Sequence, residues 1–174
     1  LMSLGVDFDV AMQALACAKR NRLFTMLNAS GRHELPDEAY QGLDLLIINR
    51  TDCAYLSGIQ PVDDEACERA LRLFADKGVK DTVILLKERG SATLVDGSYL
   101  RVPGYEVDVV DASCGGDTYV GELAARLSEG GSLAESMVYA SAAAALSLTK
   151  VGAQESIPSW SEVQSFVEDH RTRA

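Results

Sequence analysis

Residues 111–117 are Asp111-Ala112-Ser113-Cys114-Gly115-Gly116-Asp117. They follow an apolar, β-branched stretch that ends at Val110, and they open a segment whose apolar residues have helical spacing. Two adjacent glycines at the start of a helix let the backbone approach a ligand closely. The free N–H groups and the positive end of the helix dipole suit an anion such as phosphate. An aspartate beside them can take a proton from a hydroxyl that attacks the phosphate.

The same run also has a simpler interpretation. Gly-Gly-Asp before a helix can be a turn with an N-cap aspartate and no ligand. Because a short glycine motif is not specific by itself, the rest of the chain has to decide between a turn and a phosphate site.

Composition limits the class of protein. A length of 174 residues predicts one domain with a substantial core, and 47% hydrophobic with 24% charged residues is typical of a soluble globular protein. The net charge of −10 argues against nucleic acid or an anionic membrane as the main partner. It does not oppose a local phosphate site, because backbone dipoles can hold phosphate. The longest apolar run, residues 137–149, is too short to span a bilayer, and the first ten residues lack the order of a signal peptide.

Cysteine usage points to a reducing compartment. The four cysteines are scattered, no CxxC pair occurs, and the chain has two histidines. This pattern predicts neither a zinc site nor a disulfide framework. We therefore expect reduced thiols and a cytoplasmic location.

Helical and strand patterns alternate along the chain. Helices are predicted at residues 9–20, 36–42, from 49, 63–78, from 116, from 132 and from 159. Strands are predicted at residues 23–27, 43–48 and 81–86, with a hairpin of 92–95 and 99–102 around Asp96-Gly97-Ser98. Asp63 and the capping boxes that start at Ser132 and Ser159 mark three of the helix starts. Strands separated by helices indicate an α/β fold with a mostly parallel sheet. Ligands bind such sheets beyond the carboxyl ends of the strands, where Asn49, Lys87 and residues 111–117 fall.

Two further motifs accompany the glycine run at compatible spacing. They are Asn49-Arg50-Thr51-Asp52 and Lys150-Val151-Gly152-Ala153-Gln154-Glu155-Ser156-Ile157-Pro158. Together the three ordered motifs resemble the C-terminal half of a ribokinase-like (PfkB family) carbohydrate kinase. That family carries Asp-Thr-x-Gly-Ala-Gly-Asp at a strand-to-helix junction, Asn-x-x-Glu upstream and Gly-Ala-Gln-x-Ser-x-Pro downstream. The resemblance covers essentially all 174 residues.

The resemblance implies a fold and an activity. The fold would be a partial ribokinase-like three-layer α/β fold, with a mostly parallel sheet flanked by helices and with the N-terminal half and lid absent. Residues 1–174 would be the C-terminal, nucleotide-binding and catalytic portion of the kinase domain. The activity would be phosphoryl transfer from ATP to a hydroxyl of a sugar or sugar-like substrate, with Mg²⁺ and a potassium ion as cofactors.

The resemblance also assigns roles to residues. Asp117 would be the general base, and the backbone of Cys114, Gly115, Gly116 and Asp117 would form an anion hole. Asn49 and Asp52 would order Mg²⁺ and the nucleotide phosphates, mostly through water. The ATP site would also be lined by Leu85, Lys87, Gly90, Gly116 and Ser141. The potassium site, which shapes the anion hole, would use Asp111, Ser113, Ser147, Lys150, Gly152 and Ser156, partly through backbone carbonyls.

Several of these residues have structural alternatives. Asn49 can be only a helix cap, and Asp111 can be a capping carboxylate at a strand end. Ser141 lies in the small-residue run 140–145, which is typical of close helix packing.

The chain departs from the family pattern at four positions. Cys114 replaces a glycine, which requires a negative φ or a shifted loop. Gly115 replaces alanine, and Leu85 and Lys87 replace the threonine and glycine of a nucleotide-binding element. These changes leave a second hypothesis open, in which the chain is a catalytically degenerate pseudokinase or scaffold. The Cys114 thiol could also be open to oxidation, although an inert cysteine is the simpler interpretation.

The resemblance covers only half of the family's fold. The family's N-terminal half supplies most sugar contacts, several central strands and a lid. A half sheet would expose an apolar edge. We therefore expect the partner to be the missing N-terminal half or a second copy of the chain, and we expect residues 1–174 alone to have little kinase activity.

Overall fold

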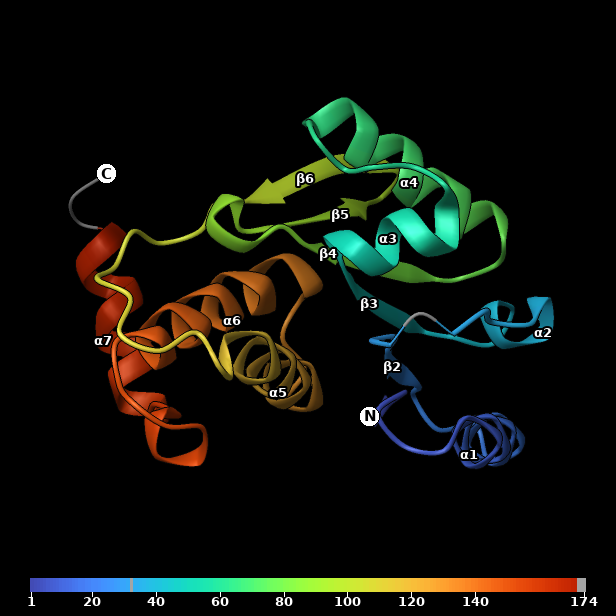
Figure 1. The fold of residues 1–174 in the computed structure, drawn as a ribbon, viewed down its shortest axis with the longest axis horizontal. Coiled ribbons are helices and arrows are strands. Elements are labelled where there is room, and N and C mark those ends of the chain that lie inside the picture. The colour runs from blue at the N-terminus through green and yellow to red at the C-terminus, as the bar shows by residue number, and fades with distance from the viewer. Residues whose placement is uncertain (32, 172–174) are drawn as a thin grey trace. The chain divides into compact units, whose positions relative to one another are not determined.

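The structure is a computed structural model that describes residues 1–31 and 33–171. The chain forms two compact units, each of which is built from two segments (Figure 1). Unit 1 comprises Leu1–Leu86 and Ala92–Arg101, and unit 2 comprises Lys87–Ser91 and Val102–Ala174.

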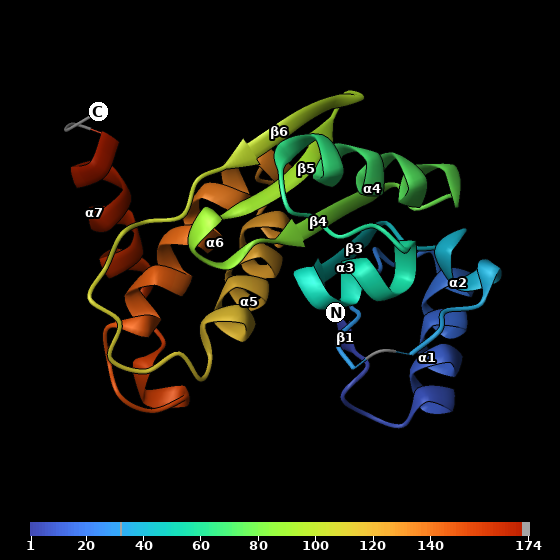
Figure 2. The same ribbon diagram turned by 45° about the horizontal axis from the view of Figure 1, so that its top comes forward.

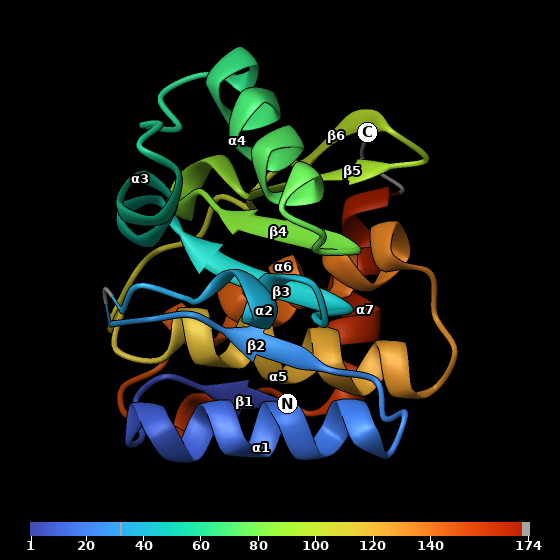
Figure 3. The same cartoon turned by 90° about the vertical axis from the view of Figure 1, so that its right-hand side faces the viewer.

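A mixed six-stranded sheet forms the centre of unit 1. Its strands follow one another in chain order: β1 (Met2–Ser3), β2 (Met26–Asn28), β3 (Leu45–Asn49), β4 (Asp81–Leu85), β5 (Ser91–Val95) and β6 (Ser98–Val102). Figure 3 shows β1 to β4 lying side by side, and all three pairings among them are parallel. The hairpin of β5 and β6 turns at Asp96 and Gly97, which both have positive φ, as a two-residue hairpin turn requires.

Four helices of unit 1 connect these strands, and local caps define several of their ends. They are α1 (Phe8–Arg20), α2 (Asp37–Tyr40), α3 (Arg50–Ser57) and α4 (Asp64–Asp76). The Asp63 carboxylate accepts the N–H of Ala66 at 2.7 Å, and Gly78 follows α4 with a φ of 96°. The predicted start and end of this helix are therefore confirmed.

The core of unit 1 lies around β3 and β4. All four apolar residues of β3, Leu45 to Ile48, are buried, so side chains on both faces of this strand are shielded from solvent. The buried residues Leu71 and Phe74 of α4 and Tyr40 of α2 pack in the same cluster as Leu46 and Ile48. This burial explains the near-continuous apolar sequence of β3.

Two strand predictions differ from the structure. The strand predicted at residues 23–27 begins only at Met26, because the chain leaving α1 first turns back on that helix. The N–H groups of Asn21, Arg22 and Leu23 donate to carbonyls of α1, and the Leu23 and Phe24 side chains remain exposed. The two-residue strand β1 was not predicted, because so short a segment carries no alternation pattern.

Unit 2 is built from helices. It contains α5 (Gly115–Ser128), α6 (Leu133–Leu148) and α7 (Trp160–Arg171), with the short 3₁₀ helices η1 (Lys87–Arg89) and η2 (Gln154–Ser156). Helices α5 and α6 lie side by side (Figure 2), and Ala142 and Ala143 of α6 pack with Val163 and Val167 of α7. The β-branched stretch before residue 111 is not a strand, and Val109 and Val110 are exposed.

Helix length and hydropathy decide whether a helix can cross a membrane. Within residues 1–31 and 33–171, no helix combines the length and the apolar character needed to cross a bilayer.

Candidate active site

The first turn of α5 is open to a ligand. Its N-cap residue, Cys114, makes no side-chain capping hydrogen bond, whereas side chains of Asp7, Asn49 and Asp63 cap α1, α3 and α4. A Cβ added at Gly116 would meet no atom within 4 Å, and Gly116 is exposed. The N-cap side chain therefore leaves the N–H groups of this turn without an acceptor, and no atom blocks the approach to Gly116, as binding of an anion requires.

Asp117 lies in this same turn. Its carboxylate is exposed and makes no hydrogen bond or ion pair within the part of the chain that the structure describes. A carboxylate without a protein partner can accept a proton from a ligand hydroxyl.

The backbone explains how this turn tolerates its two departures from the family pattern. Cys114 has a φ of −126°, which a residue with a side chain adopts without strain. A Cβ at residue 115 would lie 2.8 Å from Cδ2 of Leu148, so the leucine side chain would have to shift to admit an alanine. Gly115 is therefore matched to its neighbour on α6.

Asp111 ties the segment before α5 to the loop after α6. Its carboxylate accepts the N–H of Ser113 and the N–H of Gly152, both at 3.0 Å, and the hydroxyl of Ser113. The Ser113 hydroxyl, followed by the two N–H groups, lowers the pKa of Asp111. These hydrogen bonds agree with the alternative in which Asp111 is a capping carboxylate. The turn that Asp111 supports does not, however, follow a strand.

The Cys114 thiol makes a second connection between the same two segments. Its Sγ lies 3.0 Å from Oγ of Ser156 and 3.4 Å from the carbonyl oxygen of Ala153. Cys114 is 9% exposed, and Ser156 is fully buried. The sequence gives no sign of this pairing, because the two residues stand 42 positions apart.

Two other residues of the predicted potassium site have their side chains bonded elsewhere. The Ser147 hydroxyl donates to the carbonyl of Ala144 at 2.8 Å, within its own helix. The Lys150 ammonium pairs with Glu162 at 3.1 Å.

Unit 1 carries Asn49, Asp52 and Leu85. Asn49 ends β3 and pairs in register with Leu85 at the end of β4, so both lie at the carboxyl edge of the parallel strands. The Asn49 side chain accepts the N–H groups of Thr51 and Asp52 and donates to the Asp52 carboxylate. Asn49 is therefore a helix cap, as its structural alternative held, and it also orients a carboxylate that is only 3% exposed.

The remaining nucleotide-site candidates lie in unit 2. Lys87 has a φ of 59°, so the lysine keeps a backbone conformation that favours the family's glycine. A Cβ on Gly90 would lie 2.0 Å from the carbonyl oxygen of Val102, so close backbone packing requires this glycine. The Ser141 hydroxyl donates to the carbonyl of Pro103 at 3.2 Å, which agrees with its packing alternative.

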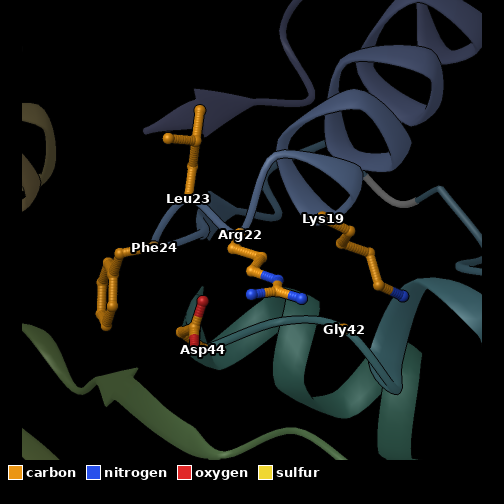
Figure 4. A pocket seen from close by; sticks show the side chains of 6 residues that line it. All are labelled: Lys19, Arg22, Leu23, Phe24, Gly42 and Asp44. Atoms are coloured by element: carbon orange, nitrogen blue, oxygen red, sulfur yellow. The ribbon is translucent and has the colours of Figure 1, made fainter.

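A surface hollow in unit 1 lies away from these residues. It has a volume of about 430 Å³ and is lined by Lys19, Arg22, Leu23, Phe24, Gly42 and Asp44. In Figure 4 the Lys19 and Arg22 side chains extend toward the segment that carries Gly42 and Asp44. Asp44 directly precedes β3 and Phe24 lies two residues before the start of β2, so the hollow lies at the amino ends of these strands, opposite Asn49. It contains none of the predicted site residues.

These features indicate the class of protein: an α/β unit with a mostly parallel sheet is followed by a helical unit, which contains a glycine-rich helix start without a side-chain cap. A family model described as pfkB family carbohydrate kinase matches residues 1–160. The chain belongs to the pfkB family of carbohydrate kinases.

Known proteins of this family resemble the chain over most of its length. A ribokinase of Haemophilus influenzae is 32% identical over 168 residues, which cover 97% of this chain and 55% of the relative. A ribokinase structure from Arabidopsis thaliana, complexed with ribose and ATP, superposes with a TM-score of 0.89 at 25% identity and covers 95% of this chain and 54% of that one. A Thermotoga maritima ribokinase superposes with a TM-score of 0.83 at 30% identity, with coverages of 95% and 55%. The expected ribokinase-like fold is thereby confirmed, and the chain spans about half the length of these relatives.

Proposed function

We propose that the protein containing this chain transfers the terminal phosphoryl group of ATP to a hydroxyl of a sugar or sugar-like substrate. The observation that carries the proposal is the first turn of α5, which is uncapped and presents an exposed Asp117. Membership of a carbohydrate kinase family supports it. The four cysteines are free, which supports a cytoplasmic location.

In this proposal, residues at the start of α5 act on both the attacking hydroxyl and the phosphoryl group. The Asp117 carboxylate accepts the proton of the sugar hydroxyl as that oxygen attacks. The N–H groups of residues 114–117 and the helix dipole stabilise the negative charge on the phosphoryl group. Gly116 lets the phosphoryl group approach the backbone, because no side chain stands in the way.

The exposed Asn49 amide, with the buried Asp52 carboxylate behind it, would hold a magnesium ion mostly through water. Proteins hold Mg²⁺ with one or two carboxylates while the ion keeps several waters, and Asp52 supplies one carboxylate beside the exposed Asn49. When bound, Mg²⁺ neutralises charge on the phosphates of ATP. Asn49 would fix the direction of the Asp52 carboxylate through its amide.

Potassium has no part in the proposal. Residues assigned to it by the resemblance do not fit a cation, because the Cys114 thiol lies against Gly152 and Ser156. The carboxylate of Asp111 already accepts two N–H groups and a hydroxyl.

The partner in this proposal is the polypeptide that completes the family's fold. It is either sequence encoded in frame with residues 1–174 or a second copy of the chain. We call the resulting assembly the complete protein.

Titration of the complete protein with Mg·ATP in a calorimeter, followed by an assay of ADP release with ribose and other sugars, tests the proposal. We expect saturable binding of ATP and sugar-dependent ADP release. A folded complete protein that binds no ATP would contradict the proposal and support the scaffold hypothesis.

A further inference from the structure

The Cys114 side chain lies among oxygen atoms of unit 2. Besides Ser156 Oγ and the Ala153 carbonyl, its Sγ lies 4.0 Å from the carbonyl oxygen of Gly152 and 3.6 Å from Oγ1 of Thr118. Cys114, Thr118 and Ser156 are all buried. The thiol therefore fills the space between the start of α5 and the loop that ends in η2.

Some of these oxygen atoms belong to residues at which the family resemblance expects potassium. Gly152 and Ser156 both belong to the expected potassium site, and Asp111 is another residue of that site. Alkali cations are held by several oxygens that together replace the hydration shell. A neutral thiol sulfur is a soft group and a poor ligand for such a hard ion. The cation and the thiol side chain would therefore compete for the same oxygens.

The hydrogen bonds of Asp111 also argue against a bound cation. Its Oδ2 accepts the Gly152 N–H at 3.0 Å, and its Oδ1 accepts the N–H and the hydroxyl of Ser113. Both oxygens of the Asp111 carboxylate are thus already engaged by protein donors. The same bonds, together with the Cys114–Ser156 contact, hold residues 111–114 against residues 152–156.

We propose that the Cys114 thiol takes the place of a monovalent cation in this chain, so that the anion hole is positioned without potassium. Cys114 then acts as a positioning residue that fixes the start of α5 through Ser156 and Ala153. The effect on phosphoryl transfer rests on the proposed function, whereas the absence of potassium binding does not.

Thermal unfolding of the complete protein in KCl, NaCl and choline chloride, at equal ionic strength, tests the cation claim without turnover. We expect the Tm of the wild type to agree within about 1 °C in the three salts, because no cation binds selectively to the folded state. Cys114→Gly frees the oxygens, and we expect KCl to raise its Tm by at least about 3 °C over choline chloride. If Cys114→Gly does not fold, Cys114→Ala removes the sulfur and carries the same expectation.

Two results would overturn the inference. One is a potassium-specific rise of Tm in the wild type. The other is a folded Cys114→Gly or Cys114→Ala protein without any potassium-specific rise, since the thiol would then not be what excludes the ion. Both results can occur in a protein that phosphorylates sugar normally, so they are separate from failure of the proposed function.

Kinetics test the positioning role. In choline chloride, we expect Cys114→Gly to lose about tenfold in kcat while the KM for ATP changes by less than about twofold. Potassium should restore the kcat of Cys114→Gly, and Cys114→Ser should keep most of it through its hydroxyl. A loss of kcat that neither potassium nor serine restores would contradict the positioning role, because a purely structural defect behaves in that way.

Discussion

Gly115 and Leu148 determine how closely α5 approaches α6 at the start of α5. A Cβ on residue 115 would lie 2.8 Å from Leu148 Cδ2, which is well inside van der Waals contact. The Leu148 carbonyl accepts the N–H groups of Val110 and Asp111 at 2.8 and 3.2 Å, so its backbone is fixed by the segment that leads into α5. Only the leucine side chain can move to make room.

Gly115→Ala should therefore destabilise the complete protein by about 1 kcal/mol, because overpacking outweighs the better helix propensity of alanine. Urea unfolding measures the change. Gly121→Ala is the matched control on the same helix, since a Cβ there meets no atom within 4 Å, and we expect it to stabilise the protein by about 0.5–1 kcal/mol.

The double variant Gly115→Ala with Leu148→Val separates overpacking from other causes. The shorter side chain should return most of the lost stability. Equal stability of Gly115→Ala and the wild type would show that the leucine moves at no cost and that the two residues are not matched.

At the residue scale, the features that could be predicted were those that depend on neighbouring residues. The sequence required either a negative φ at Cys114 or a shifted loop, and the structure has the negative φ. The cap at Asn49 followed from its position before a helix. The partners of the Cys114 thiol could not be predicted, because they depend on a loop 38 to 42 residues away.

At the scale of elements, the backbone just after η1 packs closely against the backbone that follows β6. The Gly90 backbone passes so close to Val102 and Gly104 that a Cβ would lie 2.0 Å from the Val102 carbonyl oxygen and 2.5 Å from the Gly104 nitrogen. The φ of Gly90 is 88°, which adds strain for any other residue. This glycine is needed by the fold, independently of any nucleotide.

Gly90→Ala should destabilise the complete protein by roughly 3 kcal/mol or more, because backbone has to move. Gly97→Ala is the control for φ alone: Gly97 has a φ of 76° and open space around its Cβ position, so we expect a cost of only about 1 kcal/mol. Chemical denaturation compares the two. Similar costs for both variants would mean that this backbone packing is not tight.

A reciprocal capping box starts α7. The Ser159 hydroxyl accepts the Glu162 N–H at 3.4 Å, while the Glu162 carboxylate accepts the Ser159 N–H and hydroxyl, both at 2.7 Å. These two bonds, followed by that from the Lys150 ammonium, lower the pKa of Glu162 to about 2. Because the folded-state pKa lies below the ordinary value of 4.5, ionised Glu162 stabilises the folded state above pH 4.5. That contribution is lost as the pH falls toward 2.

Glu162→Gln should lower the Tm of the complete protein by a few degrees at neutral pH. The difference from the wild type should shrink as the pH falls from about 5 to about 3, because Glu162 takes up a proton in the unfolded chain while it stays ionised in the folded one. Scanning calorimetry across this range measures the difference. A Tm difference that stays constant with pH would show that the charge of Glu162 plays no part in the cap.

Elements with local signals were predicted well. The helices at Asp63, Ser132 and Ser159 start where their caps predict, because capping depends on neighbouring residues. The strand expected from Leu23 was wrong at its start, since the turn after α1 uses backbone bonds that leave no mark on side-chain type. The valines before residue 111 have strand propensity, yet they do not form a strand in the structure.

At the scale of the whole molecule, the sheet has a short edge. Strand β1 has two residues, and large apolar side chains of Leu1, Val6 and Val10 near it are exposed. The chain spans about half the length of the relatives it matches. An edge of this kind is where the partner polypeptide of the proposed function would pair. The fold class was predictable from three ordered motifs, whereas the sugar was not, because the resemblance places most sugar contacts in the family's N-terminal half.

Residues 1–174 alone should phosphorylate ribose with a kcat/KM at least about 100-fold below that of the complete protein, because groups that position the sugar are missing. The coupled ADP assay measures both proteins at equal concentration. Full activity of the isolated chain would show that these residues bind and phosphorylate the sugar without a partner.

The kcat of Asp117→Asn, measured together with ATP affinity in the complete protein, tests the central claim most directly. We predict a fall in kcat of at least about 100-fold, because the amide cannot accept the hydroxyl proton. ATP should bind no more weakly, since the substitution removes a charge that repels phosphate. Asp108→Asn, an exposed change of the same charge outside the motif, should keep the wild-type rate. An Asp117→Asn protein that binds ATP and turns over near the wild-type rate would contradict the account.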